Sequence, residues 1–119
     1  MAQKNVYPGD YIIPFSDEVA HKIMEGKKNK TYRYGDKYSY LEEGDVVKLI
    51  KYTSKKHLAD AKIIEKYTTT FGKLGPNNEG HEKYGSKEDM RKTFNDYYSY
   101  LGRDIKDEDK FLVLKFDLL

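Results

Sequence analysis

The order of strand-forming and helix-forming segments is the feature of this sequence that most limits its fold. Two segments have helical spacing, one after the first β-type run and one before the last. Because the strands outnumber the helices and are not regularly separated by them, a doubly wound parallel sheet is disfavoured. We expect an α+β protein in which a small, twisted, partly closed β-barrel is flanked by two main helices. The β-type runs are residues 9–15, 30–34, 46–52, 58–67 and 111–119.

Each helical segment carries its own start and stop signals. Ser16 stands at an N-cap position before two acidic residues, and Gly26 can take the left-handed position after the helix. Ser86 and Asp89 form a capping-box pattern at the start of the second helix, which Gly102 ends. Apolar residues recur at helical spacing in both segments and predict the buried stripes: Val19, Ala20, Ile23 and Met24 in the first, and Met90, Phe94, Tyr97, Tyr98 and Leu101 in the second.

A glycine-rich segment at residues 71–85 separates the fourth strand from the second helix. We expect a loop there, with one helical turn at residues 71–74. Loops of this length in small domains are usually functional or mobile. On the last strand, Leu112, Leu114, Phe116 and Leu118 predict one apolar face, while Lys115 and Asp117 lie on the other.

From its composition we expect the chain to be a soluble, cytoplasmic domain. Its 119 residues suffice for a single domain, here residues 1–119 with a core at about 10–119. A net charge of +2 disfavours an electrostatically driven nucleic-acid coat, and we expect no DNA partner. Pro8, Gly9 and Asp10 interrupt the apolar core that a signal peptide would need. No apolar stretch is long enough to span a membrane, so we expect no membrane partner.

Several kinds of site are disfavoured by the residues present. The chain has no cysteine, which excludes disulfides, thiolate nucleophiles and Cys-ligated metals. His21, His57 and His81 lack the spacing of a local metal motif, and we expect neither a metal nor a cofactor. Glycine-rich phosphate loops and Gly-x-Ser-x-Gly elbows are also missing. The 12 tyrosines can pack in the core or provide a stacking surface.

A Gly-x-Lys-x-x-Thr-x-Arg motif joins the first helix to the following strand, with Gly26, Lys28, Thr31 and Arg33 at its fixed positions. The motif in this context resembles the opening of ASCH domains, the ASC-1 homology members of the PUA-like superfamily. The resemblance covers residues 10–119 and implies a PUA-like β-barrel with an RNA-related role. Further matches follow along the chain: Gly44-Asp45, Glu79-Gly80 and Tyr97-Tyr98.

One bacterial branch of compact ASCH proteins, similar to this chain in length, acts as an N4-acetylcytidine amidohydrolase through a Lys, a Thr and a Glu. The motif carries these residues over to Lys28 and Thr31, and the glycine-rich loop carries the third to Glu79. The stretch from Gly80 to Tyr84 looks more like ASCH proteins outside that branch. The resemblance therefore implies hydrolysis of N4-acetylcytidine or a related modified nucleoside, with Glu79 as the least specific match.

This chemistry needs an activated threonine. The Thr31 hydroxyl becomes a nucleophile only when a base takes its proton. Lys28 can do so if burial and the charge of Arg33 lower its pKa. Alternatively, protonated Lys28 stabilises the oxyanion while Glu79 moves the proton or activates water. Both assignments stay open at this stage.

The strand geometry sets a condition on the motif. Thr31 and Arg33 share one face of a strand, whereas Lys28 would point away if the strand had already begun. We therefore expect regular strand to begin at Lys30 or later, with Lys28 aimed inward.

The alternative function is a non-catalytic RNA-binding module. In it Lys28, Lys30 and Arg33 contact phosphate, and Tyr32 belongs to a stacking surface for unpaired bases. A ribonuclease ranks third because no pair of histidines is expected in one site. The expected partners are thus a modified nucleoside or RNA.

Overall fold

The computed structural model describes residues 11–119, in which the strands form one sheet of order β1-β3-β4-β5-β2. β1 and β3 are parallel, and the other neighbouring strands are antiparallel. Residues 9 and 10 of the first expected run lie outside the described residues. The strands are β1 (Ile12–Phe15), β2 (Lys30–Tyr34), β3 (Val46–Lys51), β4 (His57–Thr70) and β5 (Lys110–Leu118).

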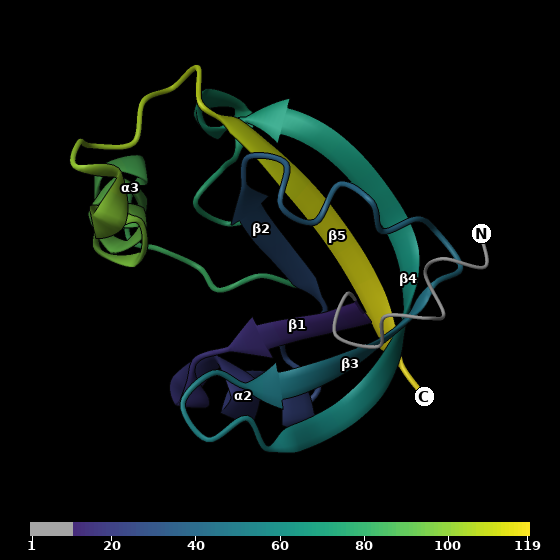
Figure 1. Cartoon of the computed structure of the whole chain (residues 1–119). Coiled ribbons are helices and arrows are strands. Elements are labelled where there is room, and N and C mark those ends of the chain that lie inside the picture. The colour runs from purple at the N-terminus through teal and green to yellow at the C-terminus, as the bar shows by residue number, and fades with distance from the viewer. Residues whose placement is uncertain (1–10) are drawn as a thin grey trace.

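The sheet is strongly curved and stays open between its edge strands, β1 and β2 (Figure 1). Register shifts at Leu49/Ile50 and at Ile63/Glu65 mark bulges, which increase the local bend and twist. One side chain bridges the opening, because Arg33 of β2 donates from Nη2 to the Pro14 carbonyl of β1 at 2.8 Å. The prediction of an α+β fold with a partly closed barrel and two main helices is confirmed.

Both helices begin at the predicted caps. The Ser16 hydroxyl accepts the Val19 N–H ahead of α2 (Asp17–Met24), and Ser86 accepts the Asp89 N–H ahead of α3 (Lys87–Tyr97). A 3-10 turn, η3 (Ser99–Leu101), follows α3 and ends at Gly102, which has a positive φ. None of the helices within residues 11–119 has the length and apolar character needed to cross a bilayer.

Two hydrophobic cores lie on opposite faces of β5. Leu112, Leu114 and Phe116 face the core shared with β1, α2 and β3, as their alternation predicted. Phe111 and Val113 face a second core, which the single-face prediction missed. The second core also holds the buried residues of the turn η2 (Phe71–Lys73), the turn's flank and α3: Phe71, Leu74, Met90 and Phe94.

The predicted buried stripe of α3 is only partly correct. Met90 and Phe94 are buried, as the helical spacing predicted. Tyr97 is 52% exposed. In Figure 1, α3 lies in a different part of the molecule from α2 and β1. The molecule therefore has one lobe around β1 and α2 and another around α3.

Candidate functional site

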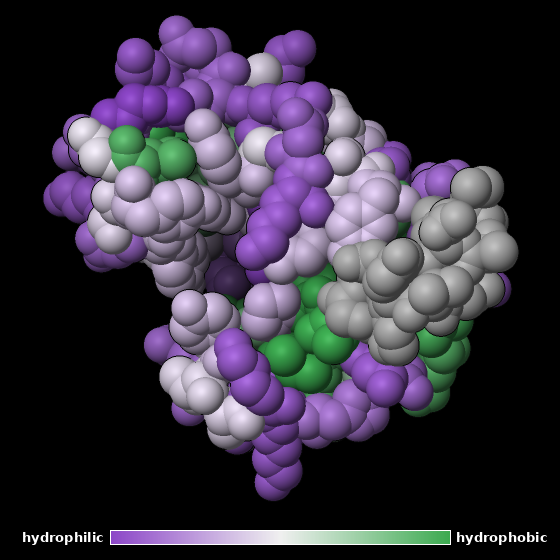
Figure 2. All heavy atoms as spheres, viewed as in Figure 1, coloured by the Kyte–Doolittle hydropathy of each residue, from purple (hydrophilic) through white to green (hydrophobic). Residues whose placement is uncertain are grey.

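A cleft of about 780 Å³ opens between the two lobes, with β2 along its floor. Figure 2 shows the hollow between the lobe that holds α3 and the lobe that holds β1 and α2. Tyrosines dominate the cleft walls, and the polar groups gather around the Gly-x-Lys-x-x-Thr-x-Arg motif. The tyrosines that line it are Tyr32, Tyr34, Tyr38, Tyr52, Tyr84, Tyr97, Tyr98 and Tyr100.

Lys28 lies inside this cleft and forms a buried ion pair. Lys28 is only 4% exposed, and β2 begins at Lys30. The prediction that the strand begins at Lys30 or later, with Lys28 aimed inward, is confirmed. Lys28 Nζ donates to Glu82 Oε2 at 2.6 Å and to the Lys30 carbonyl at 2.6 Å. Burial lowers the pKa of Lys28 to about 8, although Glu82 opposes this shift. Burial acts to raise the pKa of Glu82, but the charge and hydrogen bond of Lys28, together with His81 and a backbone hydrogen bond, lower it overall.

A backbone contact brings Glu82 to Lys28. The Gly80 carbonyl accepts the N–H groups of Asn29 and Lys30 at 2.9 and 3.0 Å, which fastens the glycine-rich loop to the start of β2. Gly80 has φ +81°, and a Cβ atom there would lie 2.1 Å from Asn29 Oδ1. The left-handed φ favours glycine, and a larger residue would also require the Asn29 side chain to move. The contact fixes which loop residues face the cleft.

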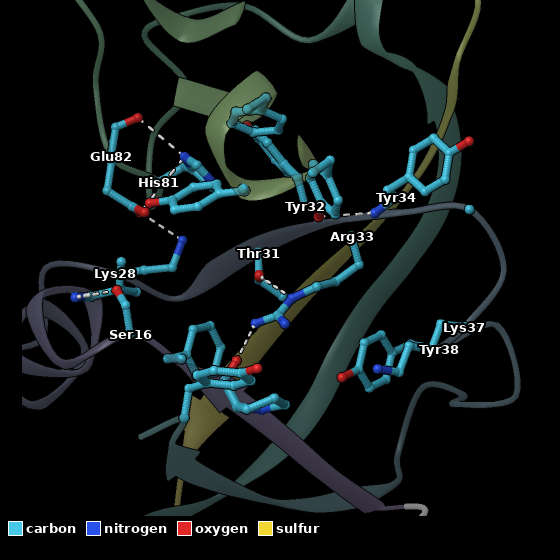
Figure 3. Close-up of a pocket in the computed structure, with 18 of the residues that line it drawn as sticks. Ser16, Lys28, Thr31, Tyr32, Arg33, Tyr34, Lys37, Tyr38, His81 and Glu82 are labelled. Atoms are coloured by element: carbon cyan, nitrogen blue, oxygen red, sulfur yellow. Dashed lines mark hydrogen bonds and ion pairs between the residues drawn. The ribbon is translucent and has the colours of Figure 1, made fainter. Parts of the chain in front are cut away.

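Thr31 and Arg33 point from β2 into the same cleft, as expected for two residues on one strand face (Figure 3). Arg33 Nε donates to Thr31 Oγ1 at 3.0 Å. The Thr31 oxygen therefore accepts from a cation, while its own proton stays available for donation. This hydrogen bond stabilises any negative charge that develops on the Thr31 oxygen.

His81 is a cleft residue that the sequence did not single out for function. Its ring stacks on Tyr32 with centroids 3.9 Å apart and an interplanar angle of 7°. His81 Nδ1 lies 3.1 Å from the Glu82 carbonyl, and because a carbonyl can only accept, Nδ1 carries the proton. Burial, with Lys28 adding to it, lowers the pKa of His81 to about 4. His81 is thus neutral at physiological pH, with Nε2 as an acceptor.

The other predicted site residues have different placements. Tyr32 lines the cleft and packs in the second core, and burial raises its pKa to about 12. Lys30 does not line the cleft with its side chain, but its carbonyl holds Lys28.

Glu79 is not brought to the cleft. Its side chain is exposed, and the carboxylate paired with Lys28 belongs to Glu82, three residues later. The segment Glu79-Gly80-His81-Glu82 offers two carboxylates. The docking of Gly80 on β2 decides between them, and the sequence of a glycine-rich loop does not reveal that register.

No metal-binding cluster is evident in the part of the chain that the structure describes. Within residues 11–119, no three His, Asp or Glu side chains lie close enough together to hold an ion. The arrangement instead offers a hydroxyl, a buried ion pair, a fixed guanidinium and a neutral imidazole in one tyrosine-lined cleft. Such a set suits acid–base and nucleophilic chemistry on a ligand with a flat ring.

Comparisons with known proteins identify the fold. No protein-family model matches this sequence, and no curated protein matches it. A protein from Enterococcus faecalis V583 of the family DUF984 is similar over 91% of this chain and 75% of its own, with a TM-score of 0.70 and 13% identity. The hypothetical protein PH0355 is similar over 91% of this chain and 97% of its own, with a TM-score of 0.65 and 18% identity.

The third solved structure is an ASCH domain from Lactobacillus crispatus JV V101. It is similar over 90% of this chain and 77% of its own, with a TM-score of 0.63 and 17% identity. The fold is therefore that of a mixed α+β domain with a twisted, open barrel. More particularly, the chain has the ASCH fold that its motif predicted.

Proposed function

We propose that this protein is a cytoplasmic amidohydrolase that removes the acyl group from N4-acetylcytidine or a closely related modified nucleoside. The observation that carries the proposal is the gathering of Thr31, the buried Lys28–Glu82 pair and Arg33 in one cleft. The tyrosine-lined walls suit a planar base, which aromatic rings can hold by stacking.

The first step is attack by Thr31. Neutral Lys28 has two N–H groups, and the Lys30 carbonyl and Glu82 Oε2 can accept both. Its lone pair is then free to take the Thr31 proton as Oγ1 bonds to the acyl carbon. With a pKa of about 8, roughly a tenth of Lys28 is neutral at pH 7. The ammonium that forms is stabilised at once by Glu82.

The second step completes the exchange of the acyl group. The C–N bond breaks, the cytosine amine leaves with a proton from Lys28, and an ester remains on Thr31. Water then attacks the ester carbon and transfers a proton to the Lys28–Glu82 pair, which releases acetate and restores the Thr31 hydroxyl. Arg33, which donates to Thr31 Oγ1, stabilises negative charge on that oxygen when it attacks the acyl carbon and again when it leaves the ester.

The direct test is incubation of the protein with N4-acetylcytidine, followed by chromatography for cytidine and acetate. We expect turnover by the native protein and its loss in Thr31→Ala and Lys28→Ala variants. Turnover that survives intact in both variants would exclude this mechanism. Thermal unfolding of each variant shows whether the loss comes from chemistry or from an unfolded chain.

The second candidate is an RNA-binding module without catalysis. It is favoured by the exposed tyrosines at the cleft rim, Tyr52, Tyr97 and Tyr100, which are free to stack on unpaired bases. Titration with single-stranded and structured RNA across salt concentrations separates the two functions. RNA binding without nucleoside turnover supports the binding module, and turnover without RNA binding supports the enzyme.

A further inference from the structure

Arg33 carries a charge that no carboxylate in the described residues neutralises. No carboxylate oxygen in the described residues lies within 4.0 Å of its guanidinium, although Arg33 lines the cleft. Glu82 acts on Arg33 only from a distance, and its Oε2 is already held by Lys28. His81 adds no charge at neutral pH. With the Lys28–Glu82 pair balanced, the cleft keeps the positive charge of Arg33.

The guanidinium is also held in one orientation. Its Nε and Nη2 donate to Thr31 Oγ1 and to the Pro14 carbonyl, and its plane lies against Phe15 at 4.7 Å and Tyr38 at 5.5 Å. Burial lowers the pKa of Arg33, which reflects a charge that has lost much of its water. An uncompensated charge in such surroundings destabilises the folded protein unless an anion approaches it.

Three N–H donors of Arg33 have no partner within the described residues, two on Nη1 and one on Nη2. Nη1 has no hydrogen-bond partner among residues 11–119. Within residues 11–119, the Tyr32 hydroxyl is the only fully enclosed side-chain nitrogen or oxygen that lacks a hydrogen-bond partner. Nη1 also lacks a partner, so it must be at least partly accessible to solvent. Since Arg33 lines the cleft, Nη1 is available to a ligand there.

A second cation lies at the same end of the cleft. Lys37 Nζ is 5.6 Å from the centre of the Tyr38 ring, the ring that Arg33 also contacts (Figure 3). Lys37 is exposed, lines the cleft and forms no ion pair within the described residues. The neighbouring acid, Asp36, pairs with Lys110 instead. Within residues 11–119, two cations without carboxylate partners thus lie near the Tyr38 ring.

We propose that this Arg33–Lys37 end of the cleft binds a phosphate group of the ligand, so that the protein acts on nucleotides rather than on free nucleosides. A phosphate provides several acceptor oxygens and up to two negative charges, which match two cations better than a single carboxylate does. The base and its acyl group then lie toward Lys28 and Thr31. The position of the base and acyl group rests on the proposed function. The phosphate contact with Arg33 and Lys37 does not depend on it.

The binding test uses cytidine, cytidine 5′-monophosphate, cytidine 3′-monophosphate and inorganic phosphate, which the proposed reaction does not consume. We expect at least one monophosphate to bind about tenfold more tightly than cytidine at low salt, with the difference shrinking as salt rises. A cytidine-centred trinucleotide that binds as well as the monophosphate points to RNA, and weaker trinucleotide binding points to free nucleotides. Equal affinities for cytidine and both monophosphates would overturn the proposal.

Variants locate the phosphate contact. We call the tighter binding of a monophosphate relative to cytidine the phosphate advantage. Lys37→Gln is expected to remove part of it. Lys62→Gln makes the same charge change on the exposed surface of β4 and is expected to keep it. Arg33→Gln is expected to abolish it and Arg33→Lys to retain part. An advantage that is unchanged in both Lys37→Gln and Arg33→Gln would contradict the assignment. If Arg33→Gln unfolds because its hydrogen bond between β2 and β1 is lost, the affinities of the native protein and of Lys37→Gln for cytidine and the monophosphates still test the proposal.

Turnover separates this inference from the proposed function. Hydrolysis of N4-acetylcytidine and of its 5′- and 3′-monophosphates is measured beside the binding assays. A phosphate advantage in binding without hydrolysis of any of them keeps the phosphate site and removes the amidohydrolase. Hydrolysis of the nucleoside with no phosphate advantage does the reverse.

Discussion

Lys28 and Glu82 form an ion pair, and burial acts on their pKa values in opposite directions, lowering that of Lys28 and raising that of Glu82. Desolvation disfavours the charge on both, yet attraction between them keeps the pair ionised near neutral pH. Lys28 is left with a pKa of about 8, close enough to physiological pH to exchange a proton. A base in an enzyme works best when its pKa lies near the working pH.

The pH dependence of turnover tests the role of Lys28. If neutral Lys28 takes the Thr31 proton, kcat/KM rises with pH and levels off above about 8. The reason is that the neutral fraction grows tenfold per pH unit below the pKa. Steady-state kinetics from pH 6 to 9.5 measure this. A decline above pH 8 would instead assign Lys28 to oxyanion stabilisation in its charged form.

Glu82→Gln and Glu79→Gln form a matched pair from one loop. Glu82→Gln is expected to lower kcat/KM by roughly 100-fold, because the ammonium of Lys28 loses its partner. It should also move the rising limb of the pH profile to lower pH, since Glu82 raises the pKa of Lys28. Glu79→Gln should leave both unchanged, because its side chain is exposed. The opposite pattern would return the catalytic role to Glu79.

At the scale of elements, the glycine-rich loop is the part that assembles the cleft. Its middle is fastened to β2 through the Gly80 carbonyl, and its far end leads into α3 at the Ser86 cap. Just after this cap, Lys87 Nζ donates to the carbonyls of Phe71 and Leu74, which ties the start of α3 to the turn where the loop starts. The loop is thus anchored at several places, and His81 and Glu82 are held against β2.

Gly80→Ala is expected to disturb the site more than a comparable change elsewhere in the loop. The left-handed φ of +81° costs an alanine about 1–2 kcal/mol, and the contact with Asn29 adds to it. Gly75→Ala is the control, because its Cβ would meet only Asn78 Nδ2 at 3.8 Å. Chemical unfolding and turnover of both variants measure the effect. Equal stability and equal activity would show that the docking of Gly80 does not position Glu82.

At the scale of the whole molecule, the cleft exists because the protein has two cores rather than one. β5 contributes to both cores, so the two lobes share one strand, and residues of β1 and β2 line the cleft between the lobes. Ionisable groups lie where the cores separate. Their altered pKa values therefore contribute to the stability of the entire fold.

Folding stability should fall as the pH drops from about 6.5 to about 4. The pKa of His81 is about 4 in the folded protein and 6.5 when unfolded, so in this interval the unfolded chain binds a proton that the folded chain does not. This single group accounts for up to about 3 kcal/mol. Glu82, whose pKa is also lowered by folding, adds to the loss.

The variant His81→Phe isolates this contribution. It keeps an aromatic ring against Tyr32 but cannot titrate, so its stability should depend less on pH between 6.5 and 4 than that of the native protein. Urea unfolding at pH 7, 5.5 and 4.5 supplies the comparison. If the free energy of unfolding changed with pH by the same amount in both proteins, His81 would have an ordinary pKa in the folded protein.

The sequence by itself determined the local elements and the fold class. Caps at Ser16 and Ser86, the alternation along β5 and the turn before Lys30 each depend on neighbouring residues, so their signals are contained in short stretches. The resemblance in the Gly-x-Lys-x-x-Thr-x-Arg motif added the ASCH fold. The same motif named Lys28, Thr31 and Arg33, which meet in the cleft.

The tertiary structure alone decided what comes to the cleft from elsewhere in the chain. Glu82 reaches Lys28 across 54 residues, and its selection over Glu79 depends on where the Gly80 carbonyl bonds to β2. Burial and the nearby Lys28 keep His81 neutral, and Tyr97 lines the cleft with half of its surface exposed. Such placements follow from long-range hydrogen bonds and from the burial of charge, which are properties of the assembled fold and not of neighbouring residues.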